Sequence, residues 1–348
     1  MPRIRTAFAL VAASALILTG CATTAAPAGT SSSGGTAATA DDAFPVTITH
    51  AFGETTIKSK PERVATVSWA NQEAALALGV VPVGMPAVTW GDDDGDGVLP
   101  WVEEKLEELG AETPVLFDEA DGFDYEAIAD AAPDVILAAY SGMNQEEYDT
   151  LSKIAPVVAY PDVAWGTTWQ ELTVVNGTAL GMKDEAEKLV DDLTGQLDDL
   201  TGAHPDIAGK TVMFSSFDAT NLAEIGFYSL EDPRQLFLQD LGMEPASTVV
   251  EQSKDTDQFW ITNSTEEIER FSDLDVLVTY GDDTTLATMQ ADPLLSRIPA
   301  VADGSVVILP IANAPLSAAA NPSPLSIPNS LTTDYVDLIG KAAAKVSD

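Results

Sequence analysis

Cysteine is almost absent from this chain of 348 residues, which contains a single one, Cys21. One thiol excludes disulfide bonds within the chain, so the fold has to be stabilised by its hydrophobic core. Histidine is nearly as scarce, since only His50 and His204 occur. A carrier of bare zinc or manganese is expected to bring several histidines and carboxylates together. Two histidines so far apart in the sequence argue against that class.

Basic residues are also few, because 16 Lys and Arg stand against 55 Asp and Glu, a net charge of −39. So acidic a protein is a poor partner for nucleic acid or for an anionic lipid surface. The sequence also lacks the G-x-S-x-G, H-E-x-x-H and phosphate-loop motifs that mark common enzyme classes. We therefore expect a protein that is not an enzyme. The abundant carboxylates leave an exported carboxylate-based hydrolase as the alternative.

Hydrophobic runs long enough to cross a membrane are missing as well. The apolar run near the N-terminus, Ala7 to Thr19, follows Arg3 and Arg5. It is shorter than the roughly 20 residues that a spanning helix needs. This pattern is typical of an export signal, which we place at residues 1–20. Residues 21–43 are small, polar and rich in Gly and Ser, which predicts a flexible tether.

The stretch Leu18 to Cys21 reads LTGC and resembles the lipobox of bacterial lipoproteins. The resemblance implies cleavage just before Cys21 and attachment of lipid, palmitate included, to that residue. Several acyl chains together give stable anchoring, so the protein is expected on the extracellular face of the cell membrane. The alternative is an ordinary secretory signal in which Cys21 is incidental.

The remaining chain alternates short apolar runs with segments of helical spacing. Near-continuous apolar runs are typical of parallel strands buried on both faces, so the pattern predicts an α/β fold. The pattern occurs twice, which predicts an N-terminal lobe at 44–166 and a C-terminal lobe at 205–348. The runs lie at 63–69, 80–86, 134–140 and 155–161, and then at 210–217, 223–229, 275–281 and 304–310.

Residues 167–204 are expected to form the helices that link the two lobes. After a breaker region around Gly177, Leu193, Leu197 and Leu200 recur on one face of a long helix. An internal sequence similarity supports the duplication, since Tyr140 and Tyr280 end two similar stretches of helix and strand.

Four segments, 63–86, 125–161, 292–310 and 321–331, resemble the ABC-transporter solute-binding proteins that carry iron–siderophore complexes. The resemblance implies two Rossmann-like lobes joined by a single long helix, with the ligand cleft between them. It also implies a monomer that binds a ferric siderophore and delivers it to the ABC permease and its ATPase subunits. No other cofactor is implied, because the siderophore already surrounds the iron. A binder of haem or cobalamin with the same fold is the alternative.

Open α/β sheets bind ligands at the carboxyl ends of their strands, so aromatic residues in those loops are candidates for ligand binding. Core or rim packing is the alternative for each of them. Arg234 either faces the cleft or pairs with Glu231 or Asp232. The candidate residues are Trp69, Trp90, Tyr140, Trp165, Phe217, Tyr228, Arg234, Trp260 and Tyr280.

Charge favours one chemical class of siderophore. Without Arg3 and Arg5 the exported chain keeps 14 basic against 55 acidic residues, a net charge of −41. A strongly anionic ferric catecholate is repelled at long range, whereas a neutral or cationic ferric hydroxamate is not. We therefore expect a hydroxamate.

Glu73 is expected to dock the permease. The resemblance implies one outward-facing carboxylate on each lobe, and Glu73 matches the first-lobe position. A solvated glutamate at a helix N-terminus, favoured by the helix dipole, is the alternative. The corresponding second-lobe position is Leu236, which departs from the pattern and leaves Glu231, Asp232 or Asp240 as substitutes.

The stretch DDDGDGVLPWVE, residues 92–103, fits the calcium-loop pattern D-x-D-x-D-G-x₅-E. Alternate carboxylates in a tightly turning loop converge on one hard cation. The candidate calcium ligands are Asp92, Asp94 and Asp96, the carbonyl of Val98 and the carboxylate of Glu103. A solvated acidic turn, with Pro100 starting the next helix, is the alternative.

Overall fold

The computed structural model describes residues 43–254, 256–311 and 315–346. The predicted export signal, Cys21 and all but the last residue of the predicted tether lie outside the described residues. Within the described part of the chain, no helix combines the length and the apolar character needed to cross a bilayer.

The first lobe is built on a five-stranded parallel sheet with the order β5-β4-β3-β6-β7. All residues of β3, β4, β6 and β7 are buried, as parallel strands covered by helices on both faces require. An antiparallel hairpin of β1 and β2 precedes the sheet. The strands are β1 (Val46–His50), β2 (Gly53–Ile57), β3 (Val64–Thr66), β4 (Gly84–Pro86), β5 (Val115–Phe117), β6 (Val135–Ala138) and β7 (Val157–Ala159); the helices are α1 (Asn71–Ala77), α2 (Pro100–Leu109), α3 (Tyr125–Asp130) and α4 (Gln145–Leu151).

The second lobe contains a six-stranded mixed sheet with the path β11-β9-β8-β12-β13, and β10 pairs with β8. Strands β8, β12 and β13 are parallel, but β9 and β11 are antiparallel to their neighbours. The expectation that the second half repeats the first is therefore wrong for the strand at 223–229. The connection between β8 and β9, residues 217–223, is too short for the crossover that a parallel pair needs.

The strands of this sheet are β8 (Thr211–Ser216), β9 (Glu224–Tyr228), β10 (Glu244–Pro245), β11 (Trp260–Ser264), β12 (Val276–Gly281) and β13 (Val306–Pro310). The helices and 3₁₀ turns of the lobe are η2 (Pro205–Ile207), α7 (Pro233–Asp240), α8 (Ser247–Ser253), η3 (Thr265–Phe271), α9 (Thr285–Ala291), η4 (Leu295–Arg297), α10 (Pro299–Asp303), α11 (Pro315–Ala319) and α12 (Ser330–Ala343). The predicted α/β class is confirmed.

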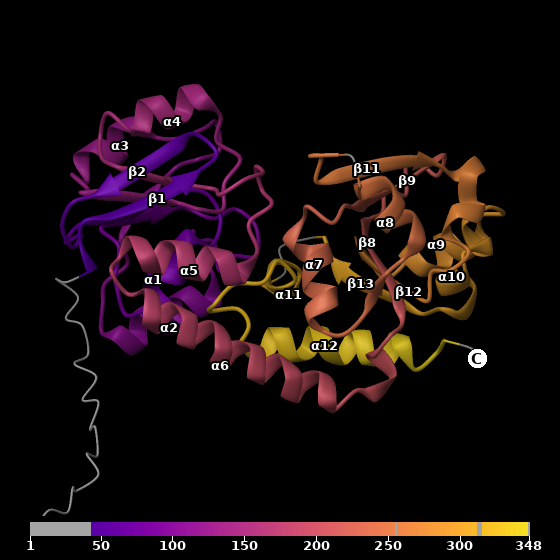
Figure 1. Cartoon of the computed structure of the whole chain (residues 1–348). Helices are drawn as coiled ribbons and strands as arrows, with labels where there is room; N and C mark the ends of the chain where they lie inside the picture. The colour runs from indigo at the N-terminus through magenta and orange to yellow at the C-terminus, as the bar shows by residue number, and fades with distance from the viewer. Residues whose placement is uncertain (1–42, 255, 312–314, 347–348) are drawn as a thin grey trace, which may run out of the picture. The chain divides into compact units, whose positions relative to one another are not determined.

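Two helices, α5 (Trp169–Ala179) and α6 (Lys183–Gly202), connect the sheets. They approach closely at Gly177, where an added Cβ would lie 2.4 Å from the Cβ of Ala186. The predicted long helix is confirmed, and Leu193 and Leu197 of α6 pack into a second-lobe core that includes Tyr335 of α12. Helix α12 lies beside α6 (Figure 1). The domain boundaries within 44–348 stay a prediction.

The chain also returns from the second lobe to the first through residues 315–329, which we call the return segment. Ala318, Ala319 and Leu325 of this segment belong to a hydrophobic cluster built around Leu76 and Trp101 of the first lobe. The contact is close, because a Cβ at Gly91 would lie 2.3 Å from the Cβ of Ala318. The lobes are therefore connected by packing as well as by the linking helices.

Glu73 lies under the return segment and is fully buried, with 0% of its surface exposed. Its carboxylate accepts a hydrogen bond from the Nε1–H of Trp101 at 2.6 Å and another from the hydroxyl of Ser323. The prediction that Glu73 docks the permease is wrong, because α2 and the return segment cover it and leave no carboxylate at the surface.

Burial raises the pKa of Glu73 to about 7, although the hydrogen bonds from Ser323 and Trp101 lower it. In the unfolded chain the group titrates near 4.5. Between pH 4.5 and pH 7 the folded state therefore binds more protons than the unfolded state. The contribution of Glu73 to stability is therefore highest below pH 4.5 and is lost as the pH rises through 7.

We predict that E73Q, which keeps the size of the side chain but removes its charge, gains stability relative to the wild type as the pH rises from 5 to 8. The pH-dependent gain has an upper bound of about 3 kcal/mol. Melting temperatures across this range measure it, and E107Q, at an exposed position of α2, is the control. Parallel profiles for E73Q and the wild type would contradict a buried, ionising carboxyl at position 73.

A second prediction follows from the two connections between the lobes. Helix α6 is one continuous helix of 20 residues, and helices bend far less readily than loops. We expect small-angle scattering to give the same radius of gyration with and without ligand, within error. A clear contraction on ligand addition would show that the return segment releases the first lobe.

Candidate ligand-binding site

An aromatic pocket of about 330 Å³ lies at the carboxyl ends of the central strands of both sheets. Trp69 follows β3, Tyr140 follows β6 and Tyr280 is the penultimate residue of β12. The carboxyl ends of parallel strands lie at the same edge of a sheet, which explains why residues so distant in sequence meet here. The lining residues are Trp69, Trp90, Tyr140, Trp165, Arg234, Phe259, Tyr280 and Asn321.

Edge-to-face ring contacts hold the aromatic wall together. Trp90 meets Tyr280 with ring centroids 5.9 Å apart at 88°, which joins the first lobe to the second. Tyr140 meets Trp165 at 5.3 Å and 86°. The Nδ2–H of Asn321, from the return segment, donates to the hydroxyl of Tyr140 at 3.2 Å. The pocket is therefore formed where three distant parts of the chain meet: the first lobe, the second lobe and the return segment.

Backbone conformations near the pocket are unusual. Trp165, and Ser68 and Ala70 on either side of Trp69, all have φ near +61°. Non-glycine residues rarely adopt this left-handed conformation, which costs on the order of 1–3 kcal/mol each and occurs preferentially at functional sites. Trp165 is also fixed by Gly142, where a Cβ would lie 2.0 Å from the indole nitrogen. Two of the pocket tryptophans are thus positioned by strained backbone.

Arg234 lines the pocket and also forms an ion pair with Asp232. The two alternatives that the sequence left open, facing the cleft or pairing with an acidic neighbour, are therefore combined in one residue. Its Nε–H and Nη2–H donate to the two carboxylate oxygens of Asp232, at 2.8 and 2.6 Å, and its guanidinium stacks 3.7 Å above the ring of Tyr228. Burial lowers the pKa of Arg234, but the charge of Asp232 raises it well above its usual value. The pair carries no net charge into the pocket.

Three of the predicted ligand-binding residues are not in the pocket lining. Tyr228 lies beneath Arg234, and Trp260 packs against Tyr228 with centroids 4.9 Å apart. Phe217 packs against a second-lobe core that contains Phe227. The other six line the pocket, together with Phe259 and Asn321, which sequence reasoning missed. Asn321 is the first residue of the segment 321–331, one of those that carry the family resemblance. This position was the one feature of the sequence that could have marked it as a candidate.

A second pocket of about 430 Å³ adjoins the first, since Trp69, Trp90 and Trp165 line both. Its other lining residues include the carboxylates Glu119 and Glu147. The Oε2 atom of Glu119 accepts a hydrogen bond from the backbone N–H of Ser68 at 2.9 Å. Burial raises the pKa of Glu119 to about 7, although this hydrogen bond lowers it. The acidic character of the chain thus extends into the binding region.

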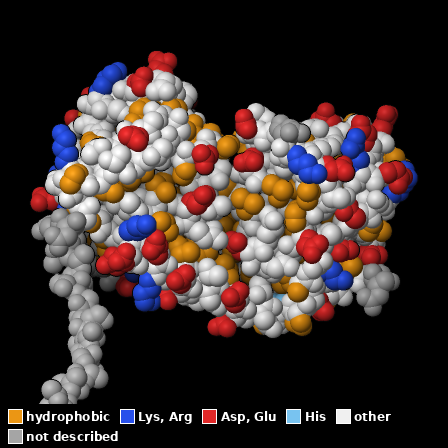
Figure 2. All heavy atoms as spheres, viewed as in Figure 1, with side chains coloured by type: hydrophobic (Ala, Val, Ile, Leu, Met, Phe, Trp, Pro, Cys, Tyr) orange, Lys and Arg blue, Asp and Glu red, His pale blue; other side chains and the backbone are white. Residues whose placement is uncertain are grey.

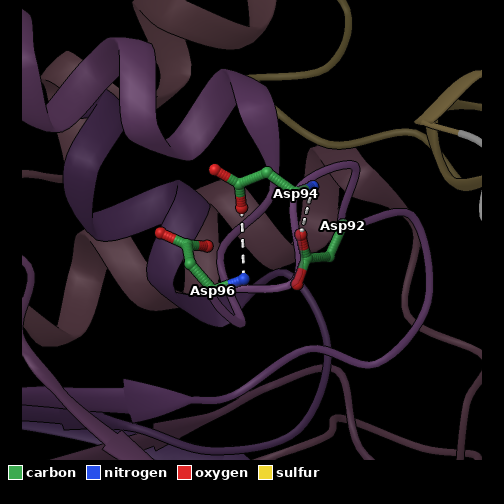
Figure 3. Close-up of side chains that lie close together, drawn as sticks. All are labelled: Asp92, Asp94 and Asp96. Atoms are coloured by element: carbon green, nitrogen blue, oxygen red, sulfur yellow. Dashed lines mark hydrogen bonds between the residues drawn. The ribbon is translucent and has the colours of Figure 1, made fainter.

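The predicted calcium loop brings its three aspartates together, as Figure 3 shows. Asp92, Asp94 and Asp96 each place a carboxylate oxygen within 4.8 Å of the others. Asp92 is buried, and its oxygens accept the backbone N–H groups of residues 94, 95 and 97 at 2.7–3.0 Å. Glu103, on α2, is not one of the residues in this cluster; burial and the charges of Asp96 and Asp94 raise its pKa.

The surface around these features is predominantly acidic. On the face drawn in Figure 2, red acidic side chains are spread over both lobes and outnumber the blue basic ones. This agrees with the excess of Asp and Glu in the sequence.

Comparison with known proteins identifies the family. The family described as periplasmic binding protein matches residues 64–312. PiaA of Streptococcus pneumoniae TIGR4, solved in complex with ferrichrome, is 42% identical with a TM-score of 0.83 over 87% of this chain and 100% of that chain. Another structure of it, named an iron uptake ABC transporter substrate-binding protein, is 41% identical with a TM-score of 0.79 over 86% and 100%.

Two curated relatives come from Bacillus subtilis (strain 168). The probable siderophore-binding lipoprotein YfiY is 28% identical and covers 67% of each chain. The iron(3+)-hydroxamate-binding protein YxeB is 23% identical over 51% of this chain and 49% of its own. The predicted two-lobed architecture and the expectation of a binding protein instead of an enzyme are confirmed. The chain belongs to the periplasmic binding protein family, whose members are solute-binding components of ABC importers.

Proposed function

We propose that this chain binds a ferric siderophore of the hydroxamate type in the aromatic pocket and delivers it to an ABC permease. The observation that carries the proposal is the pocket itself, which is aromatic and contains an arginine whose charge is already neutralised. PiaA bound to ferrichrome and the hydroxamate-binding YxeB support the same ligand class.

The chemistry of the lining residues favours chelated iron over bare ferric ion. A bare ferric ion needs anionic oxygen ligands, such as phenolates. Burial raises the pKa of Tyr140 and Tyr280, and this keeps both phenols protonated. The wall therefore offers ring faces and hydrogen-bond donors, which suit the outer surface of an organic chelate.

Charge separates the siderophore classes. A ferric catecholate carries several negative charges and needs unpaired cations to bind. Among the described lining residues of the two pockets, Arg234 is the one basic side chain, and Asp232 neutralises it. A neutral or cationic hydroxamate enters this pocket without an uncompensated charge.

The partners and the location of the protein follow from the same proposal. The transporter partners are an ABC permease and its ATPase subunits, and we expect the binding protein to act as a monomer. A lipid on Cys21 would hold it on the extracellular face of the cell membrane, beside the permease. The relative YfiY, named as a lipoprotein, supports this anchor.

We predict that ferric hydroxamates quench the intrinsic fluorescence of the protein saturably, because Trp69, Trp90 and Trp165 line the pocket. Iron-free siderophores, haem and cobalamin are titrated beside them. Substitution W165F reduces the quenching, whereas W260F, outside the pocket lining, keeps it. Saturable quenching by haem or cobalamin alone would overturn the siderophore proposal, and conversion of the ligand to a product would favour a hydrolase.

Calcium binding by residues 92–103 stays a prediction, favoured by the convergence of Asp92, Asp94 and Asp96. An extracellular loop of this type binds calcium with a Kd on the order of 10⁻⁴ to 10⁻³ M. We expect millimolar calcium to raise the melting temperature relative to chelator, and D94A/D96A to abolish the rise.

The control for this experiment is D191A/D198A, which removes two exposed carboxylates from α6 and should keep the calcium effect. If calcium has no effect, or its effect persists in D94A/D96A, the loop is an acidic turn and not a calcium site.

A further inference from the structure

Glu119 is an acidic group of the binding region that has no cationic partner among the described residues. It follows β5 and lines the second pocket beside Trp69, Trp90 and Trp165. Its Oε2 atom accepts the single hydrogen bond from Ser68, and its Oε1 atom is buried without a hydrogen-bond partner among the described residues. An unpaired buried carboxylate oxygen is costly, so such a group needs an explanation.

Asp232 and Glu119, the acidic groups beside the two pockets, differ in whether a basic residue neutralises them. Asp232 is completely buried, but Arg234 neutralises it with two charge-assisted hydrogen bonds. Glu119 has no such partner, and no Lys or Arg lines its pocket within the part of the chain that the structure describes. Glu147, the second carboxylate there, accepts the backbone N–H of Asn144. The first-lobe end of the binding region is therefore negatively charged.

The surroundings of Glu119 suit an organic cation. Three indole rings and the ring of Phe123 line the same pocket. Ring faces attract ammonium groups through their negative electrostatic potential, and the attraction grows when the cation leaves water. A carboxylate in an aromatic pocket adds a charge-assisted hydrogen bond to that attraction. A cation from the ligand would supply the partner that the protein does not.

We infer that Glu119 is a specificity-determining residue that selects ferric hydroxamates carrying a protonated amine over hydroxamates without one. The inference rests on the proposed function, and it narrows the ligand class. The chelated iron contacts the aromatic wall near Arg234, and the amine lies in the pocket of Glu119. Burial of the free carboxyl, which raises its pKa to about 7, agrees with a group that lacks its cation.

The test compares two ligands that differ in one charge. One is a linear ferric trihydroxamate that ends in a primary ammonium group, and the other is the same chelate with that amine acetylated. Fluorescence titration at pH 8, where Glu119 is ionised, gives both Kd values. We expect the wild type to bind the ammonium form at least roughly tenfold more tightly, as one hydrogen bond to a charged group allows. Raising the salt concentration should reduce the ratio.

Two variants assign the effect to this residue. In E119Q the ratio of the two Kd values should fall to within about twofold, because the amide carries no charge. The control E112Q removes an exposed carboxylate outside both pockets and should keep the ratio. Melting curves establish that each variant is folded.

The outcomes separate this inference from the proposed function. Equal Kd values for the two ligands in the wild type would overturn the inference and leave the proposed function intact. An unchanged ratio of the two Kd values in folded E119Q would also overturn the inference, because another group would then bind the ammonium group of the ligand. If neither ligand binds the wild type, the proposed function fails as well.

Discussion

The packing of the return segment against the first lobe is the constraint on which the binding region depends. Residues 315–329 insert Ala318, Ala319 and Leu325 into the first-lobe core. The same segment brings Asn321 to Tyr140 and Ser323 to Glu73. If the segment were displaced, the pocket would lose one of its walls and the buried carboxyl would lose its cover. The linking helix connects the lobes along the chain, but this packing fixes the residues that meet around the aromatic pocket.

The distribution of charge inside the binding region follows from a few buried groups. Arg234 is held by Asp232 and by the ring of Tyr228, so it offers hydrogen-bond donors and a flat surface but no net charge. Glu119 lies among tryptophans, and no Lys or Arg of the described chain lines its pocket. In a region of low dielectric constant, such an imbalance acts strongly on the charge of any ligand. The structure therefore favours neutral or cationic chelates locally as well as at long range.

Several features could be predicted from the sequence because their causes are local. The apolar spacing of Leu193 and Leu197 predicts the long helix, and that face packs into the second-lobe core. Strand ends predict where ligand residues gather, and six of nine candidates line the pocket. Phe217 and Trp260 lie outside the lining because a position near a strand end does not decide on which face of the sheet the side chain packs. The strand at 223–229 was predicted but its antiparallel direction was not, because the short connection, and not the apolar pattern, sets that direction.

By itself the sequence determined the α/β class, the linking helix, the acidic surface and the convergence of the three aspartates in a short loop. Each of these depends on periodicity, composition or spacing within a few residues. Only the tertiary structure decided the burial of Glu73 under a segment 250 positions away, the contact of Trp90 with Tyr280, and the lack of a basic residue beside Glu119 in the part of the pocket that the structure describes. Burial and charge pairing depend on which distant surfaces meet in the fold, and local sequence patterns do not specify that.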